Sequence, residues 1–313
     1  MLDLTKEKIA LTGGAGFLGR HILAELDSIG CRDVFVPRSK DYDLRTLRGI
    51  RRMLWDANPT VIIHAASLSG GIGMNQTRPA ELFYDNIRIG TQILHEAYEA
   101  GVEKFVTIGT VCEYPVNTPT PFSEERLWDG YPESTNAPYG IAKKALLVMG
   151  QAYRAQYNFN ATHLLLVNLF GPFDNFEPSS SHVIPALIRK FVEAKETGAD
   201  EVTLWGSGMA GREFLYVTDA AEAIVKATQF YDGADPINVG SGEEIHIGAL
   251  AMTIASMVGY RGTIKFDPSR PDGQPRRCLD VTKAEKLFNF KASTSLEVGL
   301  KRTIDWYLNE RKQ

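Results

Sequence analysis

A short glycine-rich stretch decides the fold: Thr12-Gly13-Gly14-Ala15-Gly16-Phe17-Leu18-Gly19 lies between an apolar segment (8–12) and a helical segment (16–30). Its glycines follow the pattern G-x-x-G-x-x-G. The first permits a tight turn, the second lets the backbone approach a pyrophosphate, and the third lets helix and strand pack closely. Amide groups at the start of the helix then bind the phosphates. We therefore predict that residues 13–19 bind a dinucleotide.

Outward from this loop, short β-branched segments alternate with helical segments. We expect strands over 8–12, 33–36, 60–64, 104–109, 161–167 and 236–239, and helices over 16–30, 44–57, 79–101, 138–157, 218–231 and 246–258. This alternation predicts an α/β fold of Rossmann type, a doubly wound parallel sheet whose ligands lie at the carboxyl ends of the strands. Two long irregular segments, 111–137 and 171–181, follow strands on that side, where loops of this length are usually functional.

Composition narrows the functional classes. The 313 residues are 44% hydrophobic and 23% charged, as in ordinary soluble globular proteins. A net charge of −4 argues against a nucleic-acid-binding protein. No segment has the length and apolarity of a membrane span, and the N-terminus lacks a signal-peptide core. The cysteines, Cys31, Cys112 and Cys278, are odd in number and widely spaced, so neither a disulfide framework nor a metal site is indicated, and we expect a cytoplasmic protein.

The end of the second predicted strand indicates which dinucleotide binds. NAD-preferring sites carry an acidic residue there, but this strand continues into Arg38, Ser39 and Lys40, with no acid before Asp41. Arg38 and Ser39 could neutralise a 2′-phosphate, which favours NADP(H) over NAD; the alternative is a solvated basic loop. Asp43 is placed either to contact the adenine or to cap the next helix.

A second motif supplies proton chemistry. Tyr139 and Lys143 form Y-x-x-x-K at the start of a predicted helix, so that both side chains lie on one face. We expect the ammonium group to lower the pKa of the phenol and to make it an acid or base near neutral pH. Lys143 can also bond to the nicotinamide ribose. Thr110, at the end of strand 104–109, completes a Thr-Tyr-Lys triad.

These motifs resemble those of the extended short-chain dehydrogenases/reductases, and more narrowly those of the GDP-L-fucose synthase family. The resemblance covers nearly the whole chain and rests on 65–66, 70–72, 109–115, 136–139, 168–172, 174–176, 181–187, 205–208, 212–215 and 271–273. The sequences H-V-I-P-A-L, W-G-S-G with R-E-F-L, and C-x-Y-P are specific to this branch. General sugar-nucleotide epimerases share only the glycine loop and Y-x-x-x-K.

The resemblance implies NADPH-dependent 3,5-epimerisation and 4-reduction of GDP-4-keto-6-deoxy-D-mannose to GDP-L-fucose. The family assigns the removal and return of α-protons to a cysteine and a histidine, which match Cys112 and His182. Tyr139 then protonates the alkoxide formed by hydride transfer, and Thr110 helps to position that oxygen. Matched positions imply further cofactor contacts at Ala65, Ala66, Ile108, Lys143, Asn168, Leu169 and His182, and substrate contacts at Lys190, Trp205, Arg212 and Asp272.

The predicted organisation follows from this resemblance and the strand pattern. Residues 1–170, with returning segments at about 213–240, are expected to form the NADP-binding Rossmann domain. Residues 171–212 and 241–313 are expected to form a smaller C-terminal substrate-binding lobe. The family resemblance and the long amphipathic helices 79–101 and 138–157 predict a homodimer.

Departures from the family pattern leave alternatives open. Threonine stands at Thr110 and valine at Val111 where the family usually has serines, and Lys190 replaces a common arginine. One alternative is a related epimerase/reductase acting on another 4-keto deoxysugar nucleotide, as in GDP-L-colitose synthesis. A second is an NAD-dependent epimerase without net reduction. A third is a non-catalytic dinucleotide sensor, although such proteins tend to lose the tyrosine–lysine pair.

Overall fold

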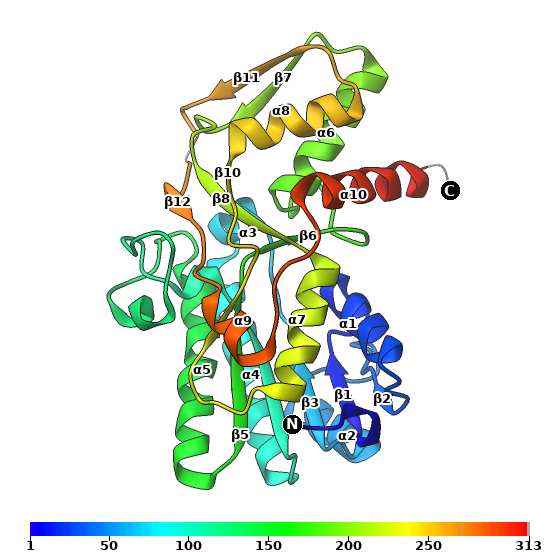
Figure 1. Cartoon of the computed structure of the whole chain (residues 1–313), viewed down its shortest axis with the longest axis vertical. Helices are drawn as coiled ribbons and strands as arrows, with labels where there is room; N and C mark the ends of the chain where they lie inside the picture. The colour runs from blue at the N-terminus through cyan, green and yellow to red at the C-terminus, as the bar shows by residue number, and fades with distance from the viewer. Residues whose placement is uncertain (271, 312–313) are drawn as a thin grey trace.

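Six parallel strands form the central sheet of the computed structural model, which describes residues 1–270 and 272–311. The strand order is β2-β1-β3-β4-β5-β9, so the order reverses between β1 and β3, where doubly wound folds bind their ligands (Figure 1). The strands are β1 (Ile9–Thr12), β2 (Val34–Phe35), β3 (Val61–His64), β4 (Lys104–Thr110), β5 (Asn160–Leu166) and β9 (Ile237–Val239). The predicted Rossmann-type fold is therefore confirmed.

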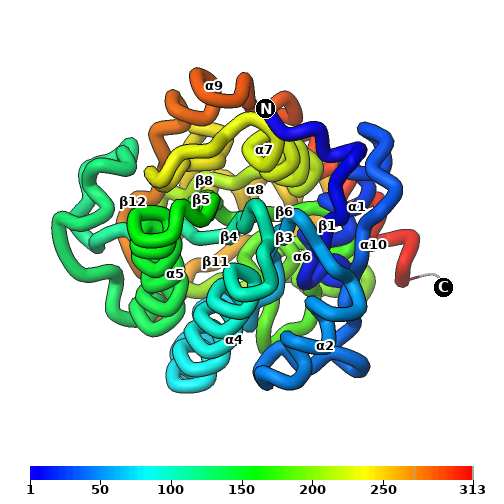
Figure 2. The backbone as a smooth tube through the Cα atoms, turned by 90° about the horizontal axis from the view of Figure 1, so that it is seen from below, coloured from blue at the N-terminus to red at the C-terminus, as the bar shows by residue number. Residues whose placement is uncertain are grey.

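Helices cover both faces of this sheet (Figure 2). On one face lie α1 (Phe17–Ser28), α7 (Val217–Phe230) and α9 (Thr282–Phe288); on the other lie α2 (Leu47–Ala57), α4 (Pro79–Glu99) and α5 (Ala137–Tyr157). Side chains alternate between the two layers along each strand. In β1, Ile9 and Leu11 pack with the α1 layer, whereas Ala10 packs with the α2 layer. Burial on both faces explains why these strands are continuous apolar runs.

A second group of elements lies beyond the carboxyl ends of the strands. Here β8 (Gly211–Tyr216) pairs with β6 (Asn168–Phe170), β10 (Glu244–His246) and β12 (Arg276–Arg277), and β7 (Glu201–Trp205) pairs with β11 (Thr263–Asp267). Three helices, α6 (Val183–Thr197), α8 (Ile247–Val258) and α10 (Leu296–Glu310), pack around them on a separate apolar core. Shorter helices are α3 (Ile72–Thr77) and the 3-10 turns Leu4–Lys6, Val111–Glu113 and Glu124–Trp128.

The predicted domain boundaries stay a prediction, but the packing of one segment bears on them. Leu279, Ala284, Phe288 and Phe290 lie in the apolar core of the main sheet, although residues 241–313 were assigned to the smaller lobe. The chain therefore returns to the Rossmann half through α9. Pro271 of the 271–273 motif and residues 312–313 lie outside the described residues.

One expected cap is wrong. The helix predicted over 44–57 begins at Leu47, and its N-cap is Thr46, whose hydroxyl accepts a hydrogen bond from the Gly49 amide at 3.0 Å. Asp43 therefore does not cap the helix; its carboxylate pairs with Arg45 at 2.9 Å instead. A threonine one residue before the helix competes successfully because it reaches the N3 amide.

Among the described residues, we find no helix with both the length and the apolar character that crossing a bilayer requires.

The glycine loop is tightly packed, and this gives a test of the fold. A Cβ atom on Gly19 would lie 2.1 Å from the Gly13 carbonyl oxygen, a backbone atom that cannot rotate away. We expect Gly19→Ala to lower the free energy of unfolding by about 1–3 kcal/mol, as overpacking does. Gly130→Ala is the matched control, because its Cβ would meet only Pro115 at 3.4 Å. Urea denaturation measures both; equal stability of the two variants would contradict the close packing.

Candidate active site

A cavity of about 1200 Å³ opens at the carboxyl ends of the parallel strands. The residues that line it come from the glycine loop, from the ends of β3, β4 and β6, and from α5, α6, β8 and the segment before β12. Every site residue expected from the sequence lines this cavity except Gly14. Gly14 faces the sheet instead: a Cβ atom there would lie 2.8 Å from Val36 Cγ1.

The glycine loop has the shape of a phosphate cradle. Gly13 has φ +72°, and a Cβ atom there would lie 2.7 Å from the Ala66 amide nitrogen, so only glycine fits. Gly16 is the N-cap of α1 and has no side chain to bond the first amides of the helix. Those amides and the helix dipole can therefore serve an anionic group in the cavity. The loop thus fits the pyrophosphate of a dinucleotide.

The rim of the cavity next to this loop carries positive charge. Arg38 and Ser39 line it on the exposed segment after β2. Asp43 also lines the cavity, and the hydrogen bond from Arg45 holds the pKa of its carboxyl below the usual value. The Asp43 carboxylate is thus bonded to Arg45, and the exposed Arg38 side chain is open to the cavity.

Tyr139 and Lys143 lie on α5 and face the cavity, as the spacing predicts. The expected lowering of the tyrosine pKa is wrong. Burial raises the pKa of Tyr139, the charge of Cys112 adds to that rise, and a hydrogen bond from Ser67 opposes it. Lys143 does not reverse the shift, because its ammonium donates to the Ile108 carbonyl at 3.0 Å and lies 6.0 Å from the centre of the tyrosine ring. Tyr139 is therefore a neutral phenol, suited to donate a proton.

Lys143 is itself strongly affected by its surroundings. Burial lowers the pKa of Lys143 to about 8, while the carboxylate of Glu113 acts in the opposite direction. Its ammonium form loses the proton as the pH rises through this value. Near neutral pH the group is a cation that can bond to ligand oxygens close to the tyrosine.

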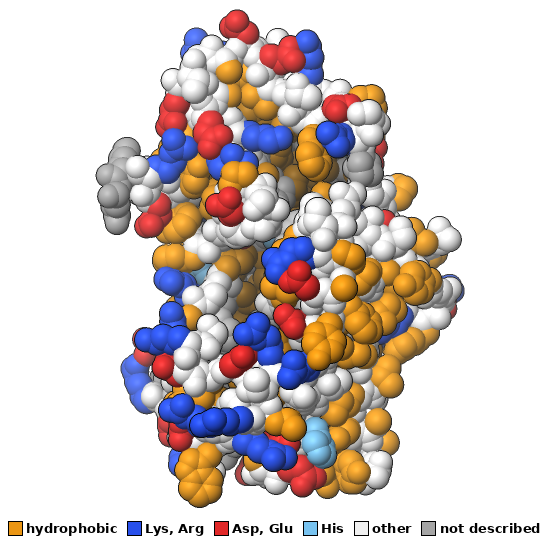
Figure 3. Space-filling view, turned by 180° about the vertical axis from the view of Figure 1, so that it is seen from behind, with side chains coloured by type: hydrophobic (Ala, Val, Ile, Leu, Met, Phe, Trp, Pro, Cys, Tyr) orange, Lys and Arg blue, Asp and Glu red, His pale blue; other side chains and the backbone are white. Residues whose placement is uncertain are grey.

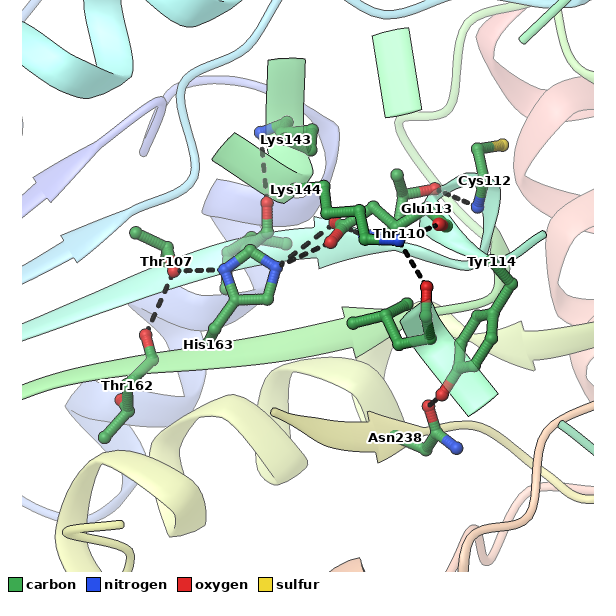
Figure 4. A network of polar contacts seen from close by, with 12 residues as sticks. Thr107, Thr110, Cys112, Glu113, Tyr114, Lys143, Lys144, Thr162, His163 and Asn238 are labelled. Carbon is green, nitrogen blue, oxygen red and sulfur yellow. Dashed lines mark hydrogen bonds and ion pairs between the residues drawn. The ribbon is translucent and has the colours of Figure 1, made fainter. Parts of the chain in front are cut away.

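Thr110 ends β4 and also caps the short turn that carries Cys112 (Figure 4). Its hydroxyl oxygen accepts a hydrogen bond from the Cys112 amide at 3.2 Å. Because this bond uses an acceptor site and leaves the hydroxyl hydrogen available, Thr110 can still donate to an oxygen in the cavity. The threonine thus offers the same hydroxyl donor that a serine would offer at this position.

Cys112 is half-buried in the cavity wall and lies beside a cation that the sequence analysis missed. Arg277 Nη1 donates to its Sγ at 3.4 Å, and Arg277 is held in turn by Gln274 at 2.8 Å. Arg212 is the strand partner of Arg277, and burial lowers the pKa of Arg212 to about 10, with a further lowering by Arg277. Arg277 thus places a guanidinium group in contact with the Cys112 sulfur at the wall of the cavity.

His182 is the N-cap residue of α6, on the wall of the same cavity. The His182 side chain is exposed to the open cavity, and desolvation by the protein packed around it lowers its pKa. The imidazole is therefore neutral at pH 7, with one nitrogen that carries a proton and one that can accept a proton. The structure thus brings Cys112, His182, Thr110 and Tyr139 around one space.

The four expected substrate contacts lie at the far end of the cavity. Arg212 Nη2 donates to the Asp272 carbonyl at 2.9 Å, and the Asp272 carboxylate accepts from Ser207 amide and hydroxyl, each at 2.7 Å. Asp272 therefore also shapes the Trp205–Gly208 turn. Trp205 is 54% exposed, with the Arg270 guanidinium 5.0 Å from its ring centre. Lys190 bonds only weakly, to the Thr203 carbonyl at 3.5 Å, and burial lowers its pKa.

The comparisons with known proteins agree with this geometry. Residues 9–240 match the model of the NAD dependent epimerase/dehydratase family. The chain belongs to this family. Among curated relatives it is 40% identical over 301 residues to GDP-L-fucose synthase 1 of Arabidopsis thaliana, covering 96% of this chain and 93% of that protein.

Solved structures of family members are also similar. A GDP-L-fucose synthetase from Naegleria fowleri bound to NADP has a TM-score of 0.90 at 30% identity, covering 100% of this chain and 96% of that chain. A GDP-6-OMe-4-keto-L-xylo-heptose reductase from C. jejuni has a TM-score of 0.92 at 28% identity, covering 98% and 99%. The Rossmann-type assignment is therefore shared across the family.

Sequence reasoning missed Ser67, Glu113 and Arg277. Arg277 lies 165 positions from Cys112, so nothing local to either residue predicts their contact. Glu113 did have a signal: Thr110-x-x-Glu113 matches the capping-box pattern, in which both side chains bond each other's backbone.

The contact between Cys112 and Arg277 gives a test that needs no substrate. Iodoacetamide should modify Cys112 ahead of the buried Cys31 and Cys278, since burial raises the pKa of Cys278 to about 12. Arg277→Gln should slow the modification of Cys112 roughly fivefold, the equivalent of about 1 kcal/mol for one hydrogen bond. Arg126→Gln, which removes an exposed arginine paired with Asp129, is the control. Mass spectrometry measures the rates, and equal rates in both variants would exclude this role for Arg277.

Proposed function

We propose that this protein is an NADPH-dependent epimerase/reductase that converts GDP-4-keto-6-deoxy-D-mannose to GDP-L-fucose. One observation carries the proposal: a single cavity is lined by the glycine loop, by the donor pair Thr110 and Tyr139, and by the proton-transfer pair Cys112 and His182. An epimerase/reductase needs all three groups in one place, and a reductase alone needs only the first two. The relatedness to a curated GDP-L-fucose synthase supports the same activity.

The chemistry follows from the state of each group. Cys112, whose sulfur accepts a hydrogen bond from Arg277, and His182, whose ring nitrogen can take up and release a proton, are suited to remove a proton from a carbon next to the keto group and to return one to the opposite face. NADPH supplies the hydride when it is bound. Tyr139, kept neutral by burial, then protonates the new alkoxide, while the Thr110 hydroxyl holds that oxygen. Arg212 and Lys190 are suited to bind the diphosphate.

A structural similarity supports a different GDP-4-keto sugar as an alternative substrate. The fold matches a C. jejuni reductase of a different GDP-4-keto sugar with a TM-score of 0.92. Lys190 offers a single charge where the GDP-L-fucose synthase family commonly has arginine, so the proposed diphosphate contact also differs from the family pattern. Turnover of another GDP-4-keto sugar in preference to GDP-4-keto-6-deoxy-D-mannose would favour this candidate.

We further propose that the protein acts as a homodimer through α4 and α5. Figure 3 shows hydrophobic side chains gathered over this part of the surface. Phe83 and Tyr84 on α4 are 37% and 57% exposed, and Val148 and Tyr157 on α5 are 48% and 43% exposed. A second copy would cover these side chains. We place the enzyme in the cytoplasm, where a thiol such as Cys112 stays reduced.

The proposed role of Tyr139 can be tested by removing its hydroxyl group. Tyr139→Phe should retain NADPH binding, measured by fluorescence titration, because the glycine loop and Lys143 remain. Turnover with GDP-4-keto-6-deoxy-D-mannose should fall about 10²–10⁴-fold, as expected for loss of a general acid. Loss of NADPH absorbance measures turnover. Undiminished turnover in this variant would rule out Tyr139 as the proton donor.

The proposed cofactor preference depends on Arg38. Arg38→Ala should weaken NADPH binding roughly 10–100-fold through loss of a charge-assisted bond to the 2′-phosphate, worth about 1.5–3 kcal/mol. NADH binding should stay within about twofold, because NADH lacks that phosphate. Equal losses for the two cofactors would show that Arg38 acts on the fold of the loop and not on the phosphate.

A further inference from the structure

A buried acid–base pair lies directly beneath the turn that carries Cys112 (Figure 4). Glu113 is the last residue of that turn and is 0% exposed, and His163 on β5 is 2% exposed. His163 Nε2 lies 3.1 Å from each oxygen of the Glu113 carboxyl group. Neither side chain lines the cavity, so neither can touch a substrate.

The hydrogen bonds around His163 determine where its protons are. Its Nδ1 lies 2.6 Å from the Thr107 hydroxyl, and that hydroxyl lies 3.0 Å from the Thr162 carbonyl oxygen. A hydroxyl has one hydrogen, and the carbonyl can only accept it. Nδ1 must therefore donate to Thr107. The other nitrogen, Nε2, then shares one proton with Glu113, either as imidazolium with carboxylate or as imidazole with carboxylic acid, because two lone pairs would repel.

Glu113 uses the same carboxyl group to fix the backbone of the turn. Its Oε1 accepts the Thr110 amide hydrogen at 2.8 Å, while the Thr110 hydroxyl accepts the Cys112 amide hydrogen. This reciprocal arrangement is a capping box, built here at the end of a sheet strand and not on a long helix. The pair also fills the space next to the strand: a Cβ atom on Gly109 would lie 2.2 Å from His163 Nε2 and 2.5 Å from Glu113 Oε1.

We propose that Glu113 and His163 are positioning residues for the epimerase/reductase reaction. The hydrogen bonds of this pair anchor the Thr110–Cys112 turn, so that the Thr110 hydroxyl hydrogen stays directed into the cavity and Cys112 stays in contact with Arg277. This inference rests on the proposed function for its effect on turnover. Its effect on Cys112 itself does not depend on which sugar is the substrate.

Two lysines complete the surroundings of Glu113. Lys144 donates to the Glu113 carbonyl at 3.4 Å, and Lys143 bonds to Ile108 on the neighbouring strand. The buried Tyr114 lies next in the chain and bonds to Asn238 at 2.7 Å, away from the pair. Among the described residues, the Glu113 carboxyl group makes its hydrogen bonds with His163 and with the Thr110 amide. The proposed anchoring of the turn depends on these bonds.

The central comparison is between Glu113→Ala and Glu113→Gln. Alanine removes the hydrogen bonds of Glu113 with His163 and with the Thr110 amide. Glutamine keeps them, because its oxygen can accept from the Thr110 amide and its amide can donate to a neutral His163 Nε2. We expect Glu113→Ala to lower kcat at least tenfold while the Kd for NADPH changes less than twofold. Glu113→Gln should restore kcat to within about threefold of the parent.

A second readout separates this inference from the proposed function. The rate at which iodoacetamide modifies Cys112 should fall at least threefold in Glu113→Ala, because the thiol loses its fixed contact with Arg277. It should recover in Glu113→Gln. Glu124→Ala is the matched control: Glu124 is another buried glutamate of the same segment, bonded to the Asn238 amide at 3.0 Å and remote from the cavity lining. If the parent protein fails to turn over the keto sugar, the proposed function fails while this readout still decides.

Two results would overturn the proposal. One is a Glu113→Ala protein whose kcat and Cys112 modification rate both stay within twofold of the parent. The other is a Glu113→Gln protein as impaired as Glu113→Ala, which would mean that the shared proton and not the hydrogen-bond geometry is required. If Glu113→Ala does not fold, the apolar double variant Glu113→Leu/His163→Leu, which replaces both members of the buried pair by apolar groups, should fold and show the same losses. Parent-like rates in it would equally overturn the proposal.

Discussion

Parallel strand register is the constraint on which the site depends. Thr12 aligns with His64, and Thr110 aligns with Leu166, so neighbouring strands end at one edge of the sheet. The strand ends then bring the residues of the cavity wall together: the glycine loop after β1, Thr110 at the end of β4 with Cys112 just beyond it, and Asn168 after β5. A change of register by one residue would turn these groups away from one another. The observed register therefore places the residues that line the cavity at one edge of the sheet.

Burial is the main influence on the charges in this cavity. It raises the pKa of Tyr139 and lowers those of Lys143, His182 and Arg212, so each of these shifts favours a neutral group. A low-polarity site strengthens the remaining interactions, including the contact between Arg277 and Cys112. Burial also explains why we propose Tyr139 as a proton donor and not as a base. A phenol that stays protonated is a donor to an alkoxide and a poor base, which suits reduction more than oxidation.

Local sequence predicted much of this structure, and long-range contacts account for what it did not predict. The glycine loop, the Y-x-x-x-K pair and the first five strands were found because each signal lies within a few residues. The start of α2 was misplaced because Thr46 competed with Asp43 for the cap. Arg277 and His163 were missed because they reach Cys112 and Glu113 across 165 and 50 residues. Only the folded chain brings such partners together, so sequence spacing does not indicate these contacts.

The most direct test of the account is turnover of GDP-4-keto-6-deoxy-D-mannose with NADPH in deuterium oxide, followed by location of deuterium in the product. We expect NADPH oxidation with deuterium at both carbons flanking the former ketone, because the proposed removal and return of protons at these carbons would exchange them with solvent. Oxidation of NADPH without deuterium at either carbon would contradict the epimerase assignment and leave a simple reductase.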